Sequence, residues 1–382
     1  MFGAVGAERH ERRIPCEFPL TVTKNIVLHD YFATADGGGR TSLALAQTLG
    51  GALAFAFRKH DHPYFRDGAP VRTIDLGCAP GVPLLRQLLV ARAFIDRTGF
   101  LQGYDRAFYS GSYAPLALLR GGAARNIAYC HTPPRFVYDQ RDDFMGRLAA
   151  WQRPLLAGFI KWFEPRFIES MHAMQRVLCN SEVVKQRIRR YLGLDATVVY
   201  PPCEVERFCW LGQRDYYLST ARLDRLKRVD LCIRAFRAMP DKRLLVVSAG
   251  DQESTLRALA AGARNIEVLG EVSERRLIDL IGGAVATLYL AVDEDFGLSP
   301  VESMAAGKPV IGAGGGGLLE TLVDGSTATL LSAEPEVDEV VGAIREMTPE
   351  RALSMRVACE ARARRFSQAA FAERLGKVLA ES

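Results

Sequence analysis

The sequence predicts an α/β protein of two doubly wound, Rossmann-like domains that face a central cleft. From residue 24 onward, short apolar runs rich in β-branched and aromatic residues alternate with helical stretches, as in parallel strands joined by crossover helices. The alternation stops at residues 198–208, where Pro201 and Pro202 can continue neither a strand nor a helix, and then restarts. The chain of 382 residues is long enough for two cores of ordinary size.

Each half of the chain contributes its own series of strands. The first half places them in runs such as NIVLHDYF, ALAFAF, RNIAYCH, RVLCNS and TVVYPP. The second half places them in DYYLSTA, RLLVVSAG, NIEVLG, AVATLYLA, KPVIGA and TATLLS, with a helix through RVDLCIRAFRAM. We therefore expect a first domain over residues 1–205 and a second over residues 206–365. Residues 366–382 form a charged helix, and its packing on the first domain is left open.

Composition excludes several classes of protein. The chain is 48% hydrophobic and 24% charged, as in globular proteins, and no apolar run approaches the roughly 20 residues of a membrane-spanning helix. The start MFGAVGAERHERR lacks the apolar core and cleavage site of a signal peptide, so we expect the protein in the cytoplasm. A net charge of +5 suits anionic small molecules or an anionic membrane surface, and is low for a protein that binds duplex DNA.

The cysteines do not indicate a metal site. The chain has eight of them, with neither a CxxC pair nor a His/Cys spacing that suits zinc. Several lie in or beside apolar runs, where a free cysteine behaves as a small hydrophobic residue. We expect them to be reduced and structural.

The segment DEDFGLSPVESMAAGKPV, residues 293–310, has two interpretations. Its run Ser-Pro-Val-Glu at residues 299–302 fits a capping box, in which Glu302 would only stabilise a helix start. Alternatively, a strand ends in an acidic loop and a glycine turn opens a helix, so that the N–H groups of Gly297, Leu298 and Ser299 favour a phosphate. Glu294 and Glu302 would then accept hydrogen bonds from sugar hydroxyls on either side, which is the layout of a sugar nucleotide.

A diphosphate needs cations, and the segment STARLDRLKRVD at residues 219–230 offers them. Arg222 and Lys227 follow a strand in the loop before the next helix. Arginine can bind phosphate oxygens in a fork, and lysine supplies a mobile point charge. The alternative is a solvated basic loop, but a phosphate-binding helix start in the same domain favours the functional interpretation.

These motifs resemble a known family. Glu294 and Glu302 form an E-x7-E motif, and ARLDRLKRVDLCIRAF is similar to the R-x4-K segment of retaining GT-B glycosyltransferases of family 4. The resemblance covers roughly residues 24–335, with further matches in the expected order. They are HDYFATADGGGR, YCHTPPRFVYD, CNSEVVKQRIRRYLG, VVYPPCEVERF, NIEVLGEVSERRL and GKPVIGAGGGGLLETLVDG. YCHTPPRFVYD and KRVD resemble the branch of mannosyltransferases in bacterial O-antigen and exopolysaccharide assembly.

The resemblance implies roles for the residues of the second domain. Glu302 would hold the nucleotide ribose, and Glu294 would lie against the hydroxyls of the transferred hexose. Arg222 and Lys227 match the pair that binds the donor diphosphate and stabilises the leaving group. Stabilising the charge that develops on the departing phosphate is where such a site gains most of its rate.

In the first domain, the resemblance points to a glycine loop and a histidine. Gly37 and Gly38 match the loop that approaches the donor phosphates across the cleft, where close approach of the backbone requires glycine. His131 matches a histidine that reaches the transferred sugar, although a packed structural histidine is the alternative. Arg40 replaces the acidic residue usual in the family, which leaves the acceptor contacts open and would suit an anionic acceptor.

The implied activity is transfer of a hexose, with retention of configuration, to a lipid-linked or growing bacterial surface glycan such as O-antigen, exopolysaccharide or lipopolysaccharide. The resemblance implies a GDP-, UDP- or ADP-linked sugar as donor, with GDP-mannose the expected one, and a polyprenyl-diphosphate-linked sugar is an expected acceptor. The resemblance implies no cofactor beyond the donor and no essential metal. The acidic run at residues 293–295 is the alternative, since clustered carboxylates can hold Mg²⁺. We expect no nucleic-acid partner.

Two other functions compete with this expectation. TIDLGCAPG at residues 73–81 reads like the first motif of an S-adenosylmethionine-dependent methyltransferase, with Asp105 as the acid that holds the ribose. That motif is short, and a methyltransferase would leave the second half of the chain unexplained. A non-catalytic protein that binds sugar nucleotides is the other competitor, and the presence of both glutamates and both cations argues against it.

Residues 144–167 combine aromatic and basic side chains in one helical stretch. Its members are Trp151, Phe159, Trp162 and Phe163, interleaved with Arg147, Arg153 and Lys161. Such a helix can lie on an anionic membrane surface, although Pro154 would kink or split it. A helix packed on the core is the alternative. Because acceptors of the resembled branch lie at the inner leaflet, peripheral attachment to the cytoplasmic face of the inner membrane is a further hypothesis.

Overall fold

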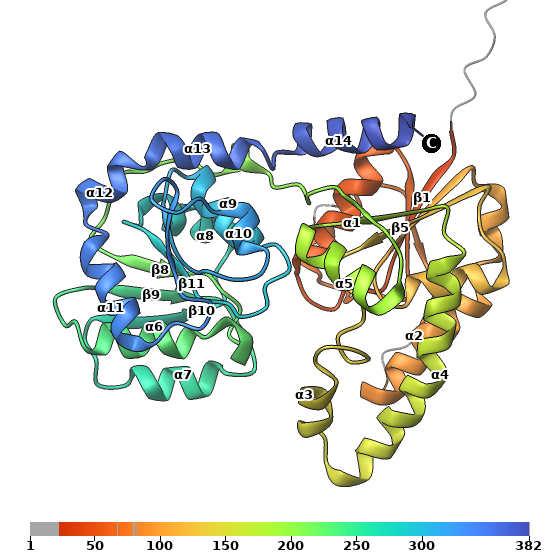
Figure 1. The fold of residues 1–382 in the computed structure, drawn as a ribbon, viewed down its shortest axis with the longest axis horizontal. Helices are drawn as coiled ribbons and strands as arrows, with labels where there is room; N and C mark the ends of the chain where they lie inside the picture. Colours follow the sequence, from red (N-terminus) through yellow and green to blue (C-terminus); the bar gives the residue numbers. More distant parts are fainter. Residues whose placement is uncertain (1–22, 67, 79–80, 82, 382) are drawn as a thin grey trace, which may run out of the picture.

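A computed structural model describes residues 23–66, 68–78, 81 and 83–381. The N-terminal segment that bears on a signal peptide therefore lies outside the described residues, as does part of the TIDLGCAPG motif. The chain forms two α/β domains that lie side by side (Figure 1). Each domain has one sheet in which every recorded strand pair is parallel, so the predicted doubly wound α/β architecture is confirmed.

The first domain contains a seven-stranded sheet in the order β3-β2-β1-β4-β5-β6-β7. Its strands are β1 (Asn25–His29), β2 (Ala52–Phe55), β3 (Thr73–Asp75), β4 (Arg106–Ser110), β5 (Arg125–Cys130), β6 (Arg176–Cys179) and β7 (Thr197–Val198). β1 lies inside the sheet and all five of its residues are buried, as expected for a strand covered on both faces.

The second domain contains a six-stranded sheet in the order β10-β9-β8-β11-β12-β13. Its strands are β8 (Tyr217–Ser219), β9 (Leu244–Val247), β10 (Ile266–Gly270), β11 (Thr287–Tyr289), β12 (Val310–Ala313) and β13 (Ala328–Leu331). In both sheets the strand order reverses beside the first strand, between β1 and β4 and between β8 and β11. Ligands of doubly wound sheets bind at such a switch point, outside the carboxyl ends of the strands.

Helices connect the strands and cover the sheets. The first domain has α1 (Gly37–Thr48), α2 (Pro83–Asp96), α3 (Arg141–Gly146), α4 (Arg153–His172) and α5 (Glu182–Leu192). The helices that follow β8 are α6 (Val229–Arg237), α7 (Glu253–Ala260), α8 (Glu274–Gly283), α9 (Leu298–Ala305), α10 (Leu318–Thr321), α11 (Val337–Glu346), α12 (Pro349–Ser354), α13 (Arg356–Arg364) and α14 (Gln368–Ala380).

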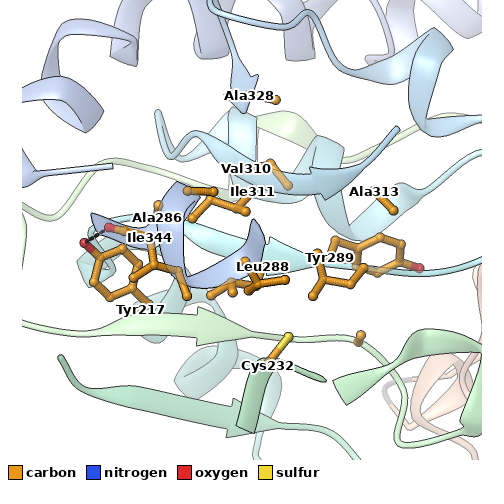
Figure 2. Packing of buried hydrophobic residues seen from close by; sticks show 14 of the residues in the cluster. Tyr217, Cys232, Ala286, Leu288, Tyr289, Val310, Ile311, Ala313, Ala328 and Ile344 are labelled. Atoms are coloured by element: carbon orange, nitrogen blue, oxygen red, sulfur yellow. Dashed lines mark hydrogen bonds between the residues drawn. The ribbon is translucent and has the colours of Figure 1, made fainter. Parts of the chain in front are cut away.

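The core of the second domain packs side chains of its central strands against the helices. Figure 2 shows Leu288 and Ile311 of neighbouring strands in one buried cluster with Ile344 of α11 and Cys232 of α6. Tyr217 is buried with its hydroxyl donating to the carbonyl of Met347 at 2.7 Å, so its polar atom is satisfied. This core holds the strand ends rigidly, which positions the loops that follow them.

The last helix returns to the first domain. After α13, the chain runs beside the linker that leaves the first domain, since the N–H of Cys203 donates to the carbonyl of Phe366 at 2.8 Å. α14 then crosses to the first domain (Figure 1). There Phe371, Leu375 and Val378 are buried in one cluster with residues of β1, β5 and α1. The question that the sequence left open, whether this helix packs back, is thus answered by its contacts.

Candidate functional site

The two switch points bring together the loops that contain the sequence-predicted residues. In the second domain, Arg222 and Lys227 follow β8 and Glu294 follows β11. In the first domain, the turn with Gly37 and Gly38 follows β1, and His131 directly follows β5. All of these positions lie beyond the carboxyl ends of strands, which is where a ligand of this architecture is expected.

Lys227 and Glu294 form a buried ion pair. Nζ of Lys227 lies 2.5 Å from Oε2 of Glu294, and the hydroxyl of Tyr289 donates to the same oxygen at 2.8 Å. Tyr289 stands at the end of the core row, and its hydroxyl points away from the other core side chains (Figure 2). Nζ of Lys227 also lies 5.4 Å from the centroid of the tyrosine ring. The core of the domain thus supports the pair directly.

The pair sets the ionisation of its members. Burial alone would raise the pKa of Glu294, but the charge of Lys227 and the hydrogen bonds from Lys227 and Tyr289 outweigh burial and lower that pKa. Burial would likewise lower the pKa of Lys227, and Tyr289 and Glu294 together raise it. Both groups are therefore charged at neutral pH.

Arg222 lies in the same loop but has a different environment. Its side chain is 61% exposed, and its Nε donates to Oδ2 of Asp224 at 2.9 Å. Asp224 in turn caps the 3₁₀ turn η6 (Arg225–Lys227) by accepting from the N–H groups of Leu226 and Lys227. The side chain of Arg222 is thus exposed to solvent, whereas that of Lys227 in the same loop is largely buried.

The helix that contains Glu302 begins differently from the capping-box expectation. α9 begins at Leu298, its N-cap is Gly297 with φ +91°, and no side chain caps it. Ser299 and Pro300 lie within the first turn, so Ser299 is not the N-cap and the capping-box interpretation is wrong. The reason is the left-handed conformation at residue 297, which glycine adopts without strain and which starts the helix two residues earlier. The N–H groups of Gly297, Leu298 and Ser299 lie at this helix start.

Glu302 instead bonds to the first domain. Its carboxylate is buried and accepts a hydrogen bond from Nη1 of Arg40, which belongs to α1. Burial would lower the pKa of Arg40, but Glu302 and Tyr64 raise it. The residue that departs from the family pattern therefore joins the two domains at the carboxylate expected to hold the ribose.

Two helix starts from different domains meet beside this ion pair. α1 begins at Gly37, with Asp36 as N-cap accepting from the N–H of Gly39 at 2.7 Å. A Cβ on Gly37 would lie only 3.0 Å from Cδ1 of Leu298, the first residue of α9. Each helix N-terminus bears partial positive charge, so their proximity favours an anionic ligand such as a diphosphate.

His131 lies against the start of α1. A Cβ on Gly38 would be 3.7 Å from Cδ2 and Nε2 of His131, so both residues border the same space. Burial, together with the neighbouring His29, lowers the pKa of His131 to about 4, and Asp36 only partly opposes this. His131 is therefore neutral at physiological pH.

Arginines of the first domain pair with the acidic loop of the second. Arg187 of α5 bonds to Asp295, and Arg135 donates to the carbonyl of Asp293 at 3.2 Å. Each carboxylate of the run 293–295 thus has a cation nearby: Arg135 at 3.9 Å from Asp293, Lys227 at Glu294, and Arg187 at Asp295. Arg187 was not among the sequence-predicted residues, because it is one of several cations in α5 and no local pattern distinguishes it.

Glu320 makes a further contact between the domains. It lies in α10, and its carboxylate accepts from the N–H groups of Glu182 at 2.8 Å and Val183 at 3.1 Å, in the first turn of α5. The adjoining glycine loop contacts the acidic loop, since the N–H of Gly317 donates to the carbonyl of Glu294 at 2.8 Å. The Glu294 loop and α5 are therefore mechanically connected through α10.

The methyltransferase motif is divided by the fold. The glycine turn at Gly77 follows the carboxyl end of β3, an edge strand, whereas Asp105 precedes β4 and accepts from the N–H of Lys24 at 2.7 Å. Asp105 thus lies at the amino ends of the strands. A strand of five residues spans about 16 Å, so the two ends cannot hold one ribose.

The stretch at residues 144–167 packs one helix face on the core, through Leu156, Ile160, Phe163 and Phe167. Phe163 is fully buried, whereas Trp151 is 70% and Leu155 is 55% exposed. Pro154 lies in the first turn of α4, where proline is tolerated, so it does not kink that helix. The expected split is confirmed, because α3 ends at Gly146 and α4 begins only at Arg153. Within the described part of the chain, no helix is both long enough and apolar enough to cross a membrane.

Comparisons with known families match both domains. A profile described as Glycosyltransferase Family 4 matches residues 41–207, and one described as Glycosyl transferases group 1 matches residues 210–366. The chain is 28% identical to alpha-1,3/1,6-mannosyltransferase ALG2 of Dictyostelium discoideum over 78% of this chain and 79% of that protein. It is 26% identical to human ALG2 over 65% of this chain and 66% of the human protein. A third match, to ALG2 of Kluyveromyces lactis, covers 63% of this chain and 56% of that protein.

A bacterial relative is also similar over a shorter region. It is the GDP-mannose-dependent alpha-(1-6)-phosphatidylinositol monomannoside mannosyltransferase of Mycolicibacterium smegmatis, 29% identical over 39% of this chain and 43% of that protein. Among solved structures, HepE of Anabaena in complex with UDP-glucose superposes with a TM-score of 0.73 at 14% identity, covering 94% of this chain and 100% of HepE. WaaG superposes with a TM-score of 0.72 at 13% identity, covering 93% of this chain and 99% of WaaG. The chain therefore belongs to the glycosyltransferases of group 1 and family 4, and its two facing domains form the GT-B fold.

Proposed function

We propose that this glycosyltransferase transfers mannose from GDP-mannose to a lipid-linked or growing bacterial surface glycan, with retention of configuration. The observation that supports this most is the buried Lys227–Glu294 pair beside two converging helix starts, which suits a sugar diphosphate. The similarity to mannosyltransferases favours mannose over other hexoses. The similarity to WaaG, described as a glycosyltransferase involved in lipopolysaccharide biosynthesis, favours a surface glycan as acceptor.

Each residue has a role in the proposed reaction. Glu302 would bind the ribose and Glu294 the hexose, while Lys227, Arg222 and the N–H groups at Gly297, Leu298 and Ser299 would neutralise the diphosphate. The acceptor oxygen attacks the anomeric carbon on the face from which the diphosphate leaves. The bond from that carbon to the phosphate oxygen breaks, and the acceptor proton passes to the departing oxygen. Cations near the leaving group lower the barrier because negative charge develops there.

We further propose that no divalent metal is essential. Lys227 and Arg222 supply the positive charge that a metal would otherwise provide, and the three carboxylates at residues 293–295 each have a cation nearby. Activity that is abolished by EDTA and restored by Mg²⁺ would contradict this proposal.

Ligand-induced stabilisation tests the donor. A ligand that binds only the folded protein raises the melting temperature, and more so the tighter it binds. We expect GDP-mannose to raise the Tm of the wild type, UDP-glucose to raise it less and S-adenosylmethionine to leave it unchanged. Glu302→Ala should lose the shift. A donor that binds without hydrolysis or transfer would instead indicate a non-catalytic binding protein, and a shift with S-adenosylmethionine would revive the methyltransferase.

The acceptor side is proposed to lie at an anionic membrane. Exposed apolar side chains occur in α2 at Leu85, Leu88 and Leu89, and before and within α4 at Trp151 and Leu155. α2 and α4 lie next to one another in the first domain (Figure 1), and cations such as Arg153 flank these residues. Binding to anionic liposomes at low salt, weakened by Trp151→Ala, is expected. A protein that ignores such liposomes would contradict peripheral attachment.

A further inference from the structure

A buried chain of polar side chains joins His131 to the body of the first domain. Nε2 of His131 lies 2.7 Å from Oγ of Ser110, which lies 2.7 Å from Oγ of Ser42. Ser42 in turn contacts Nδ1 of His29 at 2.9 Å and donates to the carbonyl of Gly38 at 2.8 Å. Nδ1 of His29 also lies 3.1 Å from the carbonyl of Ser110. Both serines are fully buried, so each contact needs a hydrogen atom from a member of the chain.

The donors and acceptors can be assigned in order from the carbonyl of Gly38. A carbonyl only accepts, so the Ser42 hydroxyl hydrogen points to Gly38. Ser42 must then accept from its other neighbours, which requires a hydrogen on Nδ1 of His29 and the hydroxyl hydrogen of Ser110. Ser110, having donated, accepts from His131, so the hydrogen of the neutral imidazole lies on Nε2. The reverse order would bring two acceptors together at Gly38.

We infer that Ser42 and Ser110 are positioning residues that hold His131 in the Nε2-protonated tautomer and leave Nδ1 as a hydrogen-bond acceptor. Among the described residues, no bond to Nδ1 is recorded, and the side chain of His131 is half-buried beside Gly38. If the proposed function holds, Nδ1 accepts a hydrogen bond from a hydroxyl of the transferred sugar. Ser110 contacts the His131 ring directly and so fixes its tautomer, whereas Ser42 acts through its hydrogen bond with Ser110.

The His131 imidazole must be neutral for Nδ1 to accept a hydrogen bond. A protonated ring has hydrogens on both nitrogens and cannot accept from a sugar. Burial and His29 lower the pKa of His131 to about 4, so the ring stays neutral in the physiological range. The groups that face the ring are His29, Ser110 and Tyr129, and Asp36 is the nearby carboxylate that opposes the shift.

The tautomer can be measured without substrate. Histidine labelled with ¹⁵N reports through two-bond couplings which ring nitrogen bears hydrogen, and His131→Asn assigns the signal. We expect the Nε2–H form in the wild type and, at least in part, the Nδ1–H form in Ser42→Ala, because the Ser110 hydroxyl is then free to donate to Nε2. Ser170→Ala is the matched control, since Ser170 is buried in α4 and no described residue hydrogen-bonds to its hydroxyl, and it should leave the tautomer unchanged.

The results separate the inference from the proposed function. An Nδ1–H or doubly protonated wild type, or an Nε2–H form that persists in both Ser42→Ala and Ser110→Ala, would overturn the role of the serines. Adding GDP-mannose should shift the Nδ1 signal in the wild type. If no sugar nucleotide shifts the Nδ1 signal, the contact between His131 and the sugar is contradicted and the proposed function loses support. The assignment of the tautomer would still stand. In turnover, Ser42→Ala should lower kcat about tenfold or less, the value of one neutral hydrogen bond, with little change in KM.

Discussion

Both glutamates of the E-x7-E motif are bonded to cations, but the two pairs differ in where their partners come from. Lys227 and Glu294 belong to one domain and rest on Tyr289, so that pair persists whatever the domains do. Arg40 and Glu302 belong to different domains, so that pair depends on closure. The first pair therefore lies within one domain, and under the ribose contact proposed for Glu302 the second would connect donor binding to the arrangement of the domains.

Replacing Lys227 by methionine tests how Glu294 stays ionised. In the wild type the pKa of Glu294 lies below its ordinary 4.5, so the pair stabilises fully above that pH and its effect fades as the pH falls through the lowered pKa. Without the cation, burial raises the pKa, and the variant loses stability as the pH rises past 4.5. We expect urea unfolding to show about 3–5 kcal/mol of destabilisation near pH 7 and less near pH 4.

Lys377→Met is the matched control for this measurement. Nζ of Lys377 lies 2.6 Å from Oε1 of Glu373, but both side chains are exposed. Exposed pairs contribute at most about 1 kcal/mol. A loss for Lys227→Met that is equally small, or that does not change with pH, would show that Glu294 is solvated rather than held by the cation.

Arg40→Met tests whether the domain-bridging pair competes with the donor. Removing Arg40 leaves a buried carboxylate without its cation, so the free protein should lose about 1–3 kcal/mol. Ribose hydroxyls would then be the main partners of Glu302, so GDP-mannose should raise the Tm by more in the variant than in the wild type. Differential scanning fluorimetry with and without donor measures both effects.

Asp143→Ala provides the comparison for Arg40→Met. Asp143 of α3 bonds to Arg225 of the second domain at 2.6 Å, so this variant also removes an ion pair between domains without touching Glu302. Its donor-induced shift should equal that of the wild type. An equal shift in Arg40→Met would mean that the Arg40–Glu302 pair remains intact when the donor binds.

At the scale of elements, α5 begins with two caps from two domains. Ser181 accepts from the N–H of Val184 at 3.1 Å, which is an ordinary N-cap. Glu320 of α10 accepts from the two preceding N–H groups, and its negative charge also suits a helix N-terminus. Four N–H groups at a helix start lack partners within the helix, and here the other domain satisfies two of them.

Hydrogen exchange can distinguish these two caps. In Glu320→Ala we expect faster exchange at the amides of Glu182 and Val183, while the amide of Val184 stays protected by Ser181. Ser181→Ala should give the reverse pattern and cost about 1 kcal/mol. If Glu320→Ala leaves the amides of Glu182 and Val183 protected, the domains do not remain in contact through this residue in solution.

Local sequence patterns predicted most helices and strands, but not the contacts between residues that are far apart in the chain. The strands and the two domains follow from alternating apolar runs, and the proline break marks the linker, because these signals are local. For α9 the sequence left two starts open: the glycine turn at Gly297 is confirmed and the capping box at Ser299 is wrong, since the left-handed Gly297 begins the helix and Glu302 contacts Arg40. Arg40 and Glu302 are 262 positions apart, so their pairing depends on how the domains face each other, which no local rule describes.

At the scale of the whole molecule, the chain passes between the domains twice, and the two connecting segments lie side by side. Cys203 of the first segment contacts Phe366 and Ser367 of the second. Two adjacent chain segments between domains are suited to a hinge, because few backbone angles need to change for the domains to move apart. The contacts between the domains away from this crossing, Arg40 with Glu302 and Glu320 with α5, are polar. Polar contacts between domains resemble transient interfaces, which allows the site to open for donor and product.

The position of α14 makes a final prediction about domain stability. Phe371 is buried in the core of the first domain although it follows the second in the chain, whereas Phe236 is buried in the core of the second. Phe371→Ala should destabilise the first domain by about 3–5 kcal/mol, seen as faster native-state hydrogen exchange in β5 but not in β9. Phe236→Ala should show the opposite pattern. If Phe371→Ala affects β9 instead, α14 is not an integral part of the first domain, and the end of the chain would then be free to leave it when the cleft opens.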